Sequence, residues 1–226
     1  MKILCIDSST KNLSLALADK DGVKYNYNKS FNKGPVSESI IPEIKNILKK
    51  VSWCLSEIDV FCVGLGPGSF TGLRVGVATI KGLAFALNKP IIGFSSLDLL
   101  AMNVNQDGQV CVIVDAKRDL VFSCVYDKLS DSISRKSEYV LSNIDDVISK
   151  LNSDVIFIGD AVPLYKEKIT ESQINLIFIE DETRYNQNAK YLWYIAQTRL
   201  EKKDFDSIEG ITPLYLYSED CQVRRK

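Results

Sequence analysis

The chain has 226 residues and contains no histidine. It therefore has no Ser-His-Asp or Cys-His catalytic group, no imidazole base near neutral pH, and no zinc site that needs an imidazole ligand. A metalloprotease is strongly disfavoured for this reason, and we expect no metal site.

The chain also has no excess of one charge and no long apolar run. Its 28 lysine and arginine residues against 29 aspartate and glutamate residues give a net charge of −1. Nucleic acid is held mainly by basic patches, so a partner would have to make most of the contacts with any RNA. The basic cluster at 224–226 is typical of a solvated tail. No apolar run approaches the ~18 residues of a membrane span and no signal-peptide pattern is present, which predicts a cytoplasmic protein without membrane contact.

The six cysteines include no C-x-x-C pair. A zinc ribbon or a thioredoxin-type motif is therefore unsupported. Free thiols inside apolar runs behave as small core residues, and we expect this of Cys5, Cys62, Cys111 and Cys124.

Apolar residues make up 46% of the chain and charged residues 25%, which is the balance of a folded domain with a core. Short apolar or alternating runs predict strands, and apolar residues at helical spacing predict helices. The predicted strands are 3–6, 13–17, 23–27, 60–65, 91–94, 110–114, 121–126, 155–158 and 174–179. The predicted helices are 40–51, 70–87, 96–102, 143–151 and 189–202, with an extended end piece at 212–216.

One arrangement of elements occurs twice along the chain. A strand, an aspartate, a polar turn and an alternating strand start at Ile3 and again at Val110, 107 residues later. Such a repeat indicates two related halves, although two unrelated hairpins would give the same pattern. Turn-forming residues cluster at 103–109. We therefore predict an N-terminal domain over 1–103 and a C-terminal domain over 104–226.

Segment 64–72 is a glycine-rich turn between a predicted strand and a predicted helix. Such a turn directs backbone N–H groups and a helix N-terminus at one point, which suits a phosphate. The segment does not end in the Gly-Lys-Ser/Thr of a Walker loop, and neither register of its glycines fits G-x-G-x-x-G. A phosphate loop is therefore the weaker interpretation.

The helix that follows carries a band of small residues at close to four-residue spacing. Each glycine inside a helix costs roughly 0.5–1 kcal/mol relative to alanine, so close approach of another element is the expected reason for keeping it. That element is either a helix of another chain or a part of the same domain. The band consists of Gly68, Gly72, Gly76, Ala78, Thr79, Gly82 and Ala86.

Asp7 and Asp115 each stand at the carboxyl end of a predicted buried strand, where open sheets place ligand groups. The two carboxylates would bind Mg²⁺ beside a nucleotide phosphate, with Ser8, Ser9 and Thr10 hydrogen-bonding that phosphate. The alternative is that both aspartates only accept hydrogen bonds from N–H groups of their own turns. Spacing alone leaves both interpretations open.

Four segments together resemble one known family. They are ILCIDSSTKNLSLAL at the start, VGLGPGSFTGLRVGVATIKGLAFALNKPIIGFSSLDLLA in the middle, VDAKRDLVFSCVY after it, and TPLYLY near the end. The chain resembles the TsaB family, bacterial proteins of tRNA threonylcarbamoyladenosine biosynthesis formerly described as glycoprotease-like. The similarity is strong from 1 to about 126, thin from 127 to 209, and returns at 212–217.

The resemblance implies an α/β fold of the actin/hexokinase/heat-shock ATPase type, with two duplicated subdomains whose mixed sheets are flanked by helices. It also implies a non-catalytic subunit that pairs with the catalytic paralogue TsaD and with the ATPase TsaE. Their complex moves threonylcarbamoyl from threonylcarbamoyl-AMP to the adenosine next to the anticodon of ANN-reading tRNAs, so tRNA would be met mainly through the complex. Family members also form homodimers through the helix that corresponds to 70–87.

The resemblance further implies that no cofactor is required. Catalytic relatives bind a metal through two histidines that this chain lacks, and hold adenosine against paired glycines where this chain has Gly159-Asp160. A vestigial nucleotide site with at most weak affinity for ADP or ATP would consist of Asp7, Ser8, Ser9, Thr10 and Asp115.

The small-residue band and the resemblance together predict that helices 70–87 and 40–51 pack against the equivalent helices of TsaD. Gly72 and Gly76 would allow close approach, so replacing Gly76 with leucine should weaken pairing and leave the fold intact. The alternative is a small-molecule kinase or ATPase of the same fold, working through the two aspartates and the turn at 8–10. The expected interface consists of Phe70, Thr71, Gly72, Leu73, Arg74 as a polar anchor, Val75, Gly76, Thr79, Ile80, Ile40 and Ile44.

Overall fold

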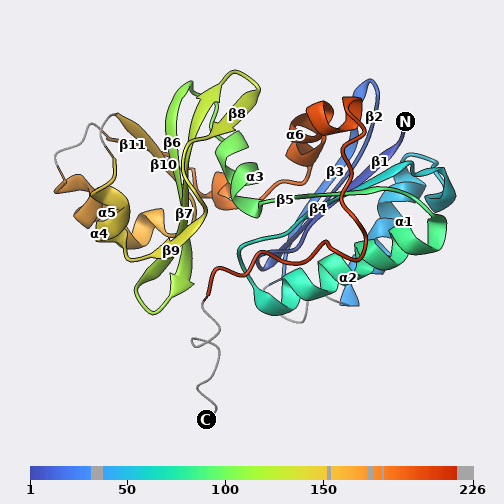
Figure 1. Ribbon diagram of the computed structural model, residues 1–226, viewed down its shortest axis with the longest axis horizontal. Helices are drawn as coiled ribbons and strands as arrows, with labels where there is room; N and C mark the ends of the chain where they lie inside the picture. The colour runs from blue at the N-terminus through green and yellow to red at the C-terminus, as the bar shows by residue number, and fades with distance from the viewer. Residues whose placement is uncertain (32–37, 152–153, 173–175, 180, 218–226) are drawn as a thin grey trace, which may run out of the picture. The chain divides into compact units, whose positions relative to one another are not determined.

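The computed structural model describes residues 1–31, 38–151, 154–172, 176–179 and 181–217 (Figure 1). Within these ranges the chain forms two compact units, each built on its own mixed sheet. Cys221 and the basic cluster at 224–226 lie outside the described residues.

The first unit contains a five-stranded sheet in the order β3-β2-β1-β4-β5. β1, β2 and β3 form an antiparallel meander, whereas β4 and β5 run parallel to β1. Parallel neighbours need crossover connections, and the helices between the strands supply them. The strands are β1 (Ile3–Asp7), β2 (Asn12–Asp19), β3 (Gly22–Ser30), β4 (Val60–Gly64) and β5 (Ile91–Phe94). The helical segments are α1 (Ile40–Lys50), the short η2 (Leu55–Glu57), α2 (Phe70–Leu87), the start of α3 (Ser96–Met102), and α6 (Lys190–Glu201).

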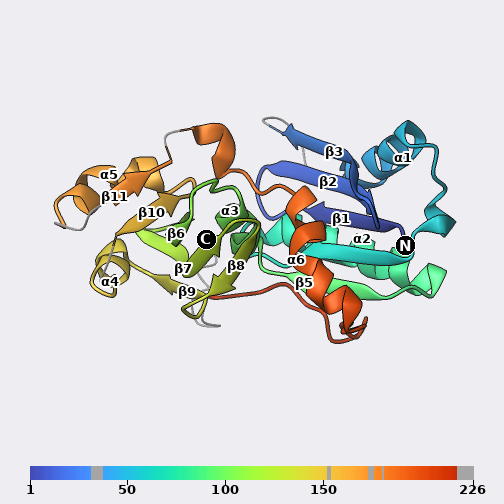
Figure 2. The same ribbon diagram turned by 90° about the horizontal axis from the view of Figure 1, so that it is seen from above.

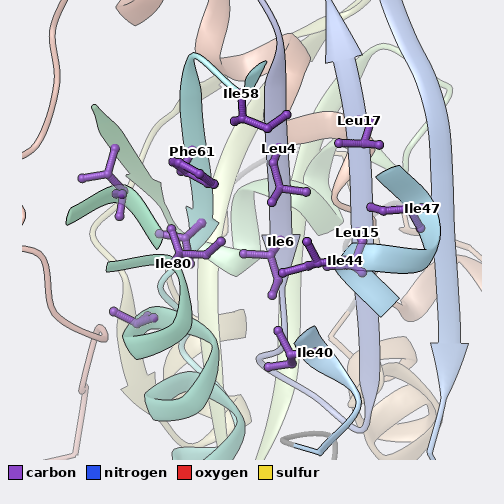
Figure 3. Close-up of a cluster of buried hydrophobic side chains, with 14 of the residues drawn as sticks. Leu4, Ile6, Leu15, Leu17, Ile40, Ile44, Ile47, Ile58, Phe61 and Ile80 are labelled. Atoms are coloured by element: carbon purple, nitrogen blue, oxygen red, sulfur yellow. The ribbon is translucent and has the colours of Figure 1, made fainter. Parts of the chain in front are cut away.

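Helices cover both faces of the first sheet (Figure 2). Because side chains alternate along β1, Leu4 faces one side and Cys5 the other. α1 and α2 pack on the first side, where Ile44 and Ile80 lie in the same cluster as Leu4 (Figure 3). α6 packs on the second side, where Leu192 joins Cys5. The whole of β1 is therefore buried, as its apolar run predicted.

The second unit repeats this arrangement. Its sheet runs β8-β7-β6-β10-β11, with β7 and β8 antiparallel to their neighbours and β10 and β11 parallel to β6. The strands are β6 (Gly108–Lys117), β7 (Leu120–Leu129), β8 (Ser132–Arg135), β9 (Val140–Ser142), β10 (Val155–Ile158) and β11 (Leu176–Phe178). The helical segments are α4 (Ile144–Ile148), α5 (Val162–Thr170) and η3 (Glu182–Tyr185).

The two sheets therefore share one topology, which confirms the duplication indicated by the sequence repeat. In each unit an aspartate lies where the first strand turns into an antiparallel hairpin, Asp7 in β1 and Asp115 in β6. Two unrelated hairpins would not also share the two parallel strands that follow.

The predicted domain boundaries are wrong in one respect. The first division falls inside α3, after Leu99, close to the predicted residue 103. Residues 187–213, however, return to the first unit, and the chain belongs to the second unit again from Leu214. The reason is that α6 covers the second face of the first sheet, which would otherwise be exposed. Apolar periodicity shows that a helix has a buried side but not which sheet it covers.

Four elements of the second unit were not predicted: α5, β8, β9 and the short η3. α5 has two fully buried apolar side chains, Val162 and Ile169, and its exposed Leu164 blurs the periodicity. β8 and β9 are two short pieces that pair with β7 on either side of the connection at 136–139. α4 is shorter than the predicted 143–151, and 212–216 is neither helix nor strand.

Among the described residues, α2 is long and apolar enough to pass a membrane-span test by length and composition. The core helix of a folded domain passes the same test, so the result is weak evidence for a span. Val77, Ile80 and Ala84 of α2 are buried against the sheet, and Leu73 is also buried. These side chains account for the hydropathy of the helix.

Candidate functional site

The glycines at the start of α2 lie against the turn that follows β1. The carbonyl oxygen of Ser8 occupies the place where a Cβ of Gly72 would be, and the hydroxyl of Ser8 does the same at Gly76. The backbone of Ser9 blocks Gly68 in the same way. The close approach that these glycines permit is therefore to the chain's own 8–9 turn, and the prediction that Gly72 and Gly76 admit a partner helix is wrong.

Hydrogen bonds fasten this contact. Ser8 Oγ donates to the carbonyl oxygen of Gly72 at 2.9 Å, and the Ser69 N–H donates to the carbonyl oxygen of Ser9 at 2.6 Å. Ser69 also caps α2, its hydroxyl accepting the Gly72 N–H at 3.4 Å. The hydroxyl of Ser69 and the N–H groups of Ser69 and Gly72 are thus used inside the unit and are not directed at a phosphate.

Asp7 is a buried carboxylate with partners on both oxygens. Oδ1 accepts hydrogen bonds from the Ser9 N–H at 2.9 Å and the Ser9 hydroxyl at 2.6 Å, and Oδ2 accepts one from the Ser96 hydroxyl at 2.5 Å. A side chain at Gly64 would collide with Oδ2, so β4 also closes around it. Burial raises the pKa of Asp7, and the hydrogen bonds from Ser9 and Ser96 oppose that rise. The bond from the Ser9 N–H is the turn contact that the alternative interpretation of Asp7 expected. The contacts with Ser96 and with the backbone at Gly64 were not expected, and they join β1 to α3 and β4.

The other residues of the predicted nucleotide turn are similarly occupied. Ser8 and Ser9 are buried, and Thr10 Oγ1 accepts the Asn12 N–H at 3.2 Å. A phosphate at this turn would have to displace contacts that the first unit makes with itself.

Asp115 stands at the corresponding place in the second unit. Its carboxylate accepts hydrogen bonds from the Lys117 N–H at 2.8 Å and from the Lys117 ammonium, while its own N–H donates to Asp160 Oδ1 at 2.9 Å. Burial acts to raise the pKa of Asp115, but hydrogen bonding and the charge of Lys117 outweigh it, so the pKa is lowered. Burial raises the pKa of Asp160. Asp115 too supports its own hairpin, and across the described parts of the chain no three acidic or thiol side chains are grouped to hold a metal ion.

The predicted interface residues divide into an inner and an outer set. Ile40, Ile44, Leu73 and Ile80 are buried in the core of the first unit, so their assignment as partner contacts is wrong. Figure 3 shows that Ile40, Ile44 and Ile80 point into that core. The remaining members of the predicted set are at least partly exposed: Phe70, Thr71, Arg74, Val75 and Thr79. The guanidinium of Arg74 lies over the Phe70 ring, 3.6 Å from its centroid.

A different stripe of small residues faces outward on α2. Ala78, Gly82 and Ala86 are exposed and recur every fourth residue, and a Cβ at Gly82 would meet no atom within 4 Å. Phe85, beside this stripe, is 75% exposed. We call Arg74, Ala78, Gly82, Phe85 and Ala86 the outer face of α2. The small-residue band in the sequence already contained Ala78, Gly82 and Ala86. Only the position of the core, however, shows which members of the band are exposed.

The segment that follows α6 binds α2 along one edge of the outer face, at Lys81. The Lys81 ammonium donates to the carbonyl oxygens of Glu209 and Ile211, at 3.2 and 3.0 Å. Ile211 is buried in the core that α2 shares with α1. The orientation of the outer face is therefore fixed by contacts within the unit.

Comparison with known proteins gives the family. The family model TsaD, described as tRNA N6-adenosine threonylcarbamoyltransferase, matches residues 35–224. The tRNA threonylcarbamoyladenosine biosynthesis protein TsaB of Haemophilus influenzae is 30% identical over 236 residues, covering 97% of this chain and 94% of that protein. The chain belongs to the TsaB family.

Other comparisons agree with this TsaB-family assignment. The TsaB protein of Bacillus subtilis is 28% identical, covering 99% of this chain and 97% of that protein. A crystal structure described as YeaZ from Pseudomonas aeruginosa has a TM-score of 0.82 at 23% identity and covers 95% of this chain and 99% of that one. A Pseudomonas aeruginosa protein described as similar to peptidase YeaZ has a TM-score of 0.85 at 22% identity, with coverages of 96% and 99%. The two structures show that the fold is shared over the whole length.

The expected architecture of two duplicated α/β units, with mixed sheets flanked by helices, is confirmed by the sheet topology and by the fold shared with these two structures. As a TsaB-family protein, the chain takes part in tRNA threonylcarbamoyladenosine biosynthesis.

Proposed function

We propose that this TsaB-family chain is a non-catalytic subunit that binds TsaD and supports its transfer of threonylcarbamoyl to the adenosine next to the anticodon. The observation that carries the proposal is the outer face of α2, where small side chains and an exposed phenylalanine lie together on a rigid helix. A helix can approach such a stripe closely, and aromatic residues are enriched at interface centres. The partner contact thus lies on the side of α2 opposite Gly72 and Gly76.

The residues available for chemistry support a role without catalysis. The chain has no histidine, and the Asp7 carboxylate, Ser8 and Ser9 are buried and hydrogen-bonded within their own unit. A kinase or ATPase of the same fold would need these groups to face Mg²⁺ and a phosphate. We therefore expect no required cofactor and at most weak ADP or ATP binding. Calorimetry with ATP and Mg²⁺ tests this, and tight binding with turnover by the isolated chain would favour the enzyme.

The wider assembly follows from the same proposal. With a net charge of −1, the chain relies on its partners for most contacts with tRNA in the cytoplasm. TsaE joins the complex, and a homodimer through α2 competes with the TsaD pair for the same face. A stable interface of this kind buries about 1,200–2,000 Å².

The test is a bulky substitution on the outer face. Gly82→Leu places a side chain where a partner helix would approach, in space that the chain itself leaves open. We expect the affinity for TsaD, measured by calorimetry, to fall by roughly 10-fold or more, with the melting temperature no lower than that of wild type, because leucine is a better helix former than glycine. Thr198→Leu is the matched control, because Thr198 is exposed on α6, on the opposite side of the sheet. Unchanged affinity of the Gly82→Leu variant would show that α2 does not meet TsaD.

A further inference from the structure

A hollow of about 490 Å³ lies in the second unit, between its sheet and α4. The sheet side comes from β7 and β9, where Ser123 lies opposite Val140, and Val125 shares their face because side chains alternate along a strand. The helix side comes from Val147 of α4 and from Leu151, which follows the helix. We call this hollow the α4 pocket. Its volume is in the range of sites that hold a small molecule.

The residues that line the α4 pocket divide by their exposure. Ser123, Val147 and Leu151 are buried, and Val125 and Val140 are half-buried. The charged residues that line it are all exposed, and they are Lys136, Glu138, Asp146 and Lys150. A ligand would therefore place an apolar part against the buried side chains and its charged groups at the opening.

Two of the four charged residues already lie beside an opposite charge. Lys136 binds Asp127 at 3.0 Å, and Glu138 lies 3.9 Å from Arg135. These two side chains are therefore less available to a ligand than the remaining pair.

That pair, Asp146 and Lys150, has opposite charges and lines one pocket. The two residues are four apart, a spacing that commonly gives an ion pair on a helix, yet they form none within the part of the chain that the structure describes. The reason is that α4 ends at Ile148, so Lys150 lies beyond the helix. Asp146 accepts a hydrogen bond from the uncharged Asn143 amide at 2.8 Å. A molecule with both an ammonium and a carboxylate group would neutralise both side chains.

A third polar group of the α4 pocket also lacks a partner. The Ser142 hydroxyl oxygen is buried and has no hydrogen-bond partner among the described residues, although Ser142 lines the pocket. Leaving a buried hydroxyl unpaired is unfavourable. A serine hydroxyl can turn between three staggered positions, so an acceptor inside the pocket, such as a carboxylate oxygen, would satisfy it.

We propose that the α4 pocket binds a free amino acid with an aliphatic side chain. The Lys150 ammonium and the Ser142 hydroxyl bind its carboxylate, Asp146 binds its ammonium, and its side chain packs against Val147 and Leu151. A nucleotide or another strongly anionic ligand is disfavoured, because two carboxylates line the pocket beside the two lysines. The site lies in the second unit and uses no residue that we assign to partner binding.

The first experiment compares three ligands on the full chain by calorimetry. We expect L-leucine to bind. Leucinamide, which lacks the carboxylate, and isocaproate, which lacks the ammonium, should each bind at least about 10-fold more weakly, because each loses a charged hydrogen bond. Isocaproate binding as tightly as leucine would overturn the role of Asp146. No binding of leucine, valine, isoleucine or methionine at about 10 mM would overturn the proposal.

The second experiment removes the unpartnered hydroxyl. Ser142→Ala should weaken leucine binding by roughly 5–10-fold without lowering the melting temperature of the ligand-free chain, since that hydroxyl has no partner to lose. Ser134→Ala is the matched control, because Ser134 is exposed on β8, which also pairs with β7, and does not line the pocket. Equal leucine affinities of the two variants would overturn the role of Ser142.

The third experiment assigns the two charges separately. Lys150→Gln should weaken binding of leucine and isocaproate by roughly 10-fold and leave leucinamide unaffected. Asp146→Asn should weaken leucine and leucinamide and leave isocaproate unaffected, and asparagine keeps an oxygen for the Asn143 amide. Leucine binding that neither variant changes would place the amino acid elsewhere and overturn the assignment to this pocket.

The outcomes are independent of the proposed function. Failure of leucine to bind would overturn the α4 pocket as an amino-acid site and leave TsaD binding through α2 standing. Unchanged TsaD affinity of the Gly82→Leu variant would overturn the α2 interface and leave leucine binding unaffected.

Discussion

Ser8 and Gly72 are joined by a hydrogen bond, Oγ to carbonyl oxygen at 2.9 Å, across 64 residues of sequence. The contact exists because Gly72 and Gly76 have no side chains to keep the 8–9 turn away from α2. It ties the end of β1 to the first turns of the helix that we assign to partner binding. The glycines of this helix therefore have two uses: Gly72 and Gly76 admit the chain's own turn on one side, and Gly82 leaves the other side open.

Substitution by alanine should change the stability of the chain in opposite directions at Gly76 and at Gly82. Gly76→Ala places a Cβ against the Ser8 hydroxyl, and we expect the free energy of unfolding to fall by about 1–3 kcal/mol. Gly82→Ala meets no neighbour and should raise it by about 0.5–1 kcal/mol, because alanine is the better helix former. Urea unfolding of both variants measures the difference.

Gly76→Leu should consequently damage the fold itself, contrary to the expectation that it leaves the fold intact. Loss of partner binding by that variant would say nothing about the interface. A Gly76→Ala variant as stable as wild type would contradict the packing described here.

Asp7 should make stability depend on pH. Burial raises its folded-state pKa above the ordinary value of 3.8. Between those two values the folded chain holds a proton that the unfolded chain has released, so the free energy of unfolding falls as pH rises through that window. Asp7→Asn lacks this titration. The free energy of unfolding of wild type minus that of the variant should therefore decline as pH rises through the window, and should not change with pH on either side of it. Urea unfolding at a series of pH values measures it, and a difference that grows with pH would contradict the raised pKa.

Removing the Asp7 side chain should be far more damaging than replacing it with asparagine. Asp7→Ala leaves the Ser9 N–H and the Ser9 and Ser96 hydroxyls without their acceptor in a buried place. Each unsatisfied buried donor costs about 1–3 kcal/mol. Thermal unfolding should give a melting temperature for Asp7→Ala well below that of Asp7→Asn. Equal melting temperatures would mean that the hydrogen bonds to the Asp7 side chain do not stabilise the fold.

The segment after α6 should loosen when its arginine clamp is removed. Arg199 donates to both carboxylate oxygens of Asp206, at 3.2 and 3.1 Å, and to the Gly93 carbonyl oxygen at 3.2 Å. Lysine cannot reproduce this forked geometry. Arg199→Lys should lower the free energy of unfolding by about 1 kcal/mol, a modest figure because water partly screens the pair. Hydrogen exchange should be faster at the Asp206 N–H, which bonds to Ile91 at 2.9 Å, with exchange at β1 unchanged as the control.

Phe85 offers a test that separates stability from binding. The side chain is 75% exposed, so Phe85→Ser should change the free energy of unfolding by less than about 0.5 kcal/mol. If the outer face of α2 is an interface, the same substitution should weaken TsaD binding by about 1–2 kcal/mol. Calorimetry and urea unfolding on one preparation give both numbers, and full affinity in the variant would count against the outer face.

Local pattern determined most of the elements. The apolar run at 3–6 and the alternation after it specify β1 and β2, and Ser69 and Asn88 stand at the two ends of α2 as a side-chain cap and a left-handed residue. The repeat at Ile3 and Val110 was readable for the same reason, since both halves use the same strand periodicity. α5 was not, because it has few buried apolar residues from which to judge a period.

Only the tertiary structure shows which residues of α2 are buried and which are exposed. The sequence by itself determined that a helix spans 70–87, that it carries small residues, and that the chain lacks histidine. Tertiary structure decided that Gly72 and Gly76 face Ser8 while Gly82 is open, that Ile44 and Ile80 are core, and that α6 returns to the first sheet. The physical reason is that spacing fixes which side chains share one side of a helix, whereas the choice of side to bury depends on neighbours brought together from distant parts of the chain.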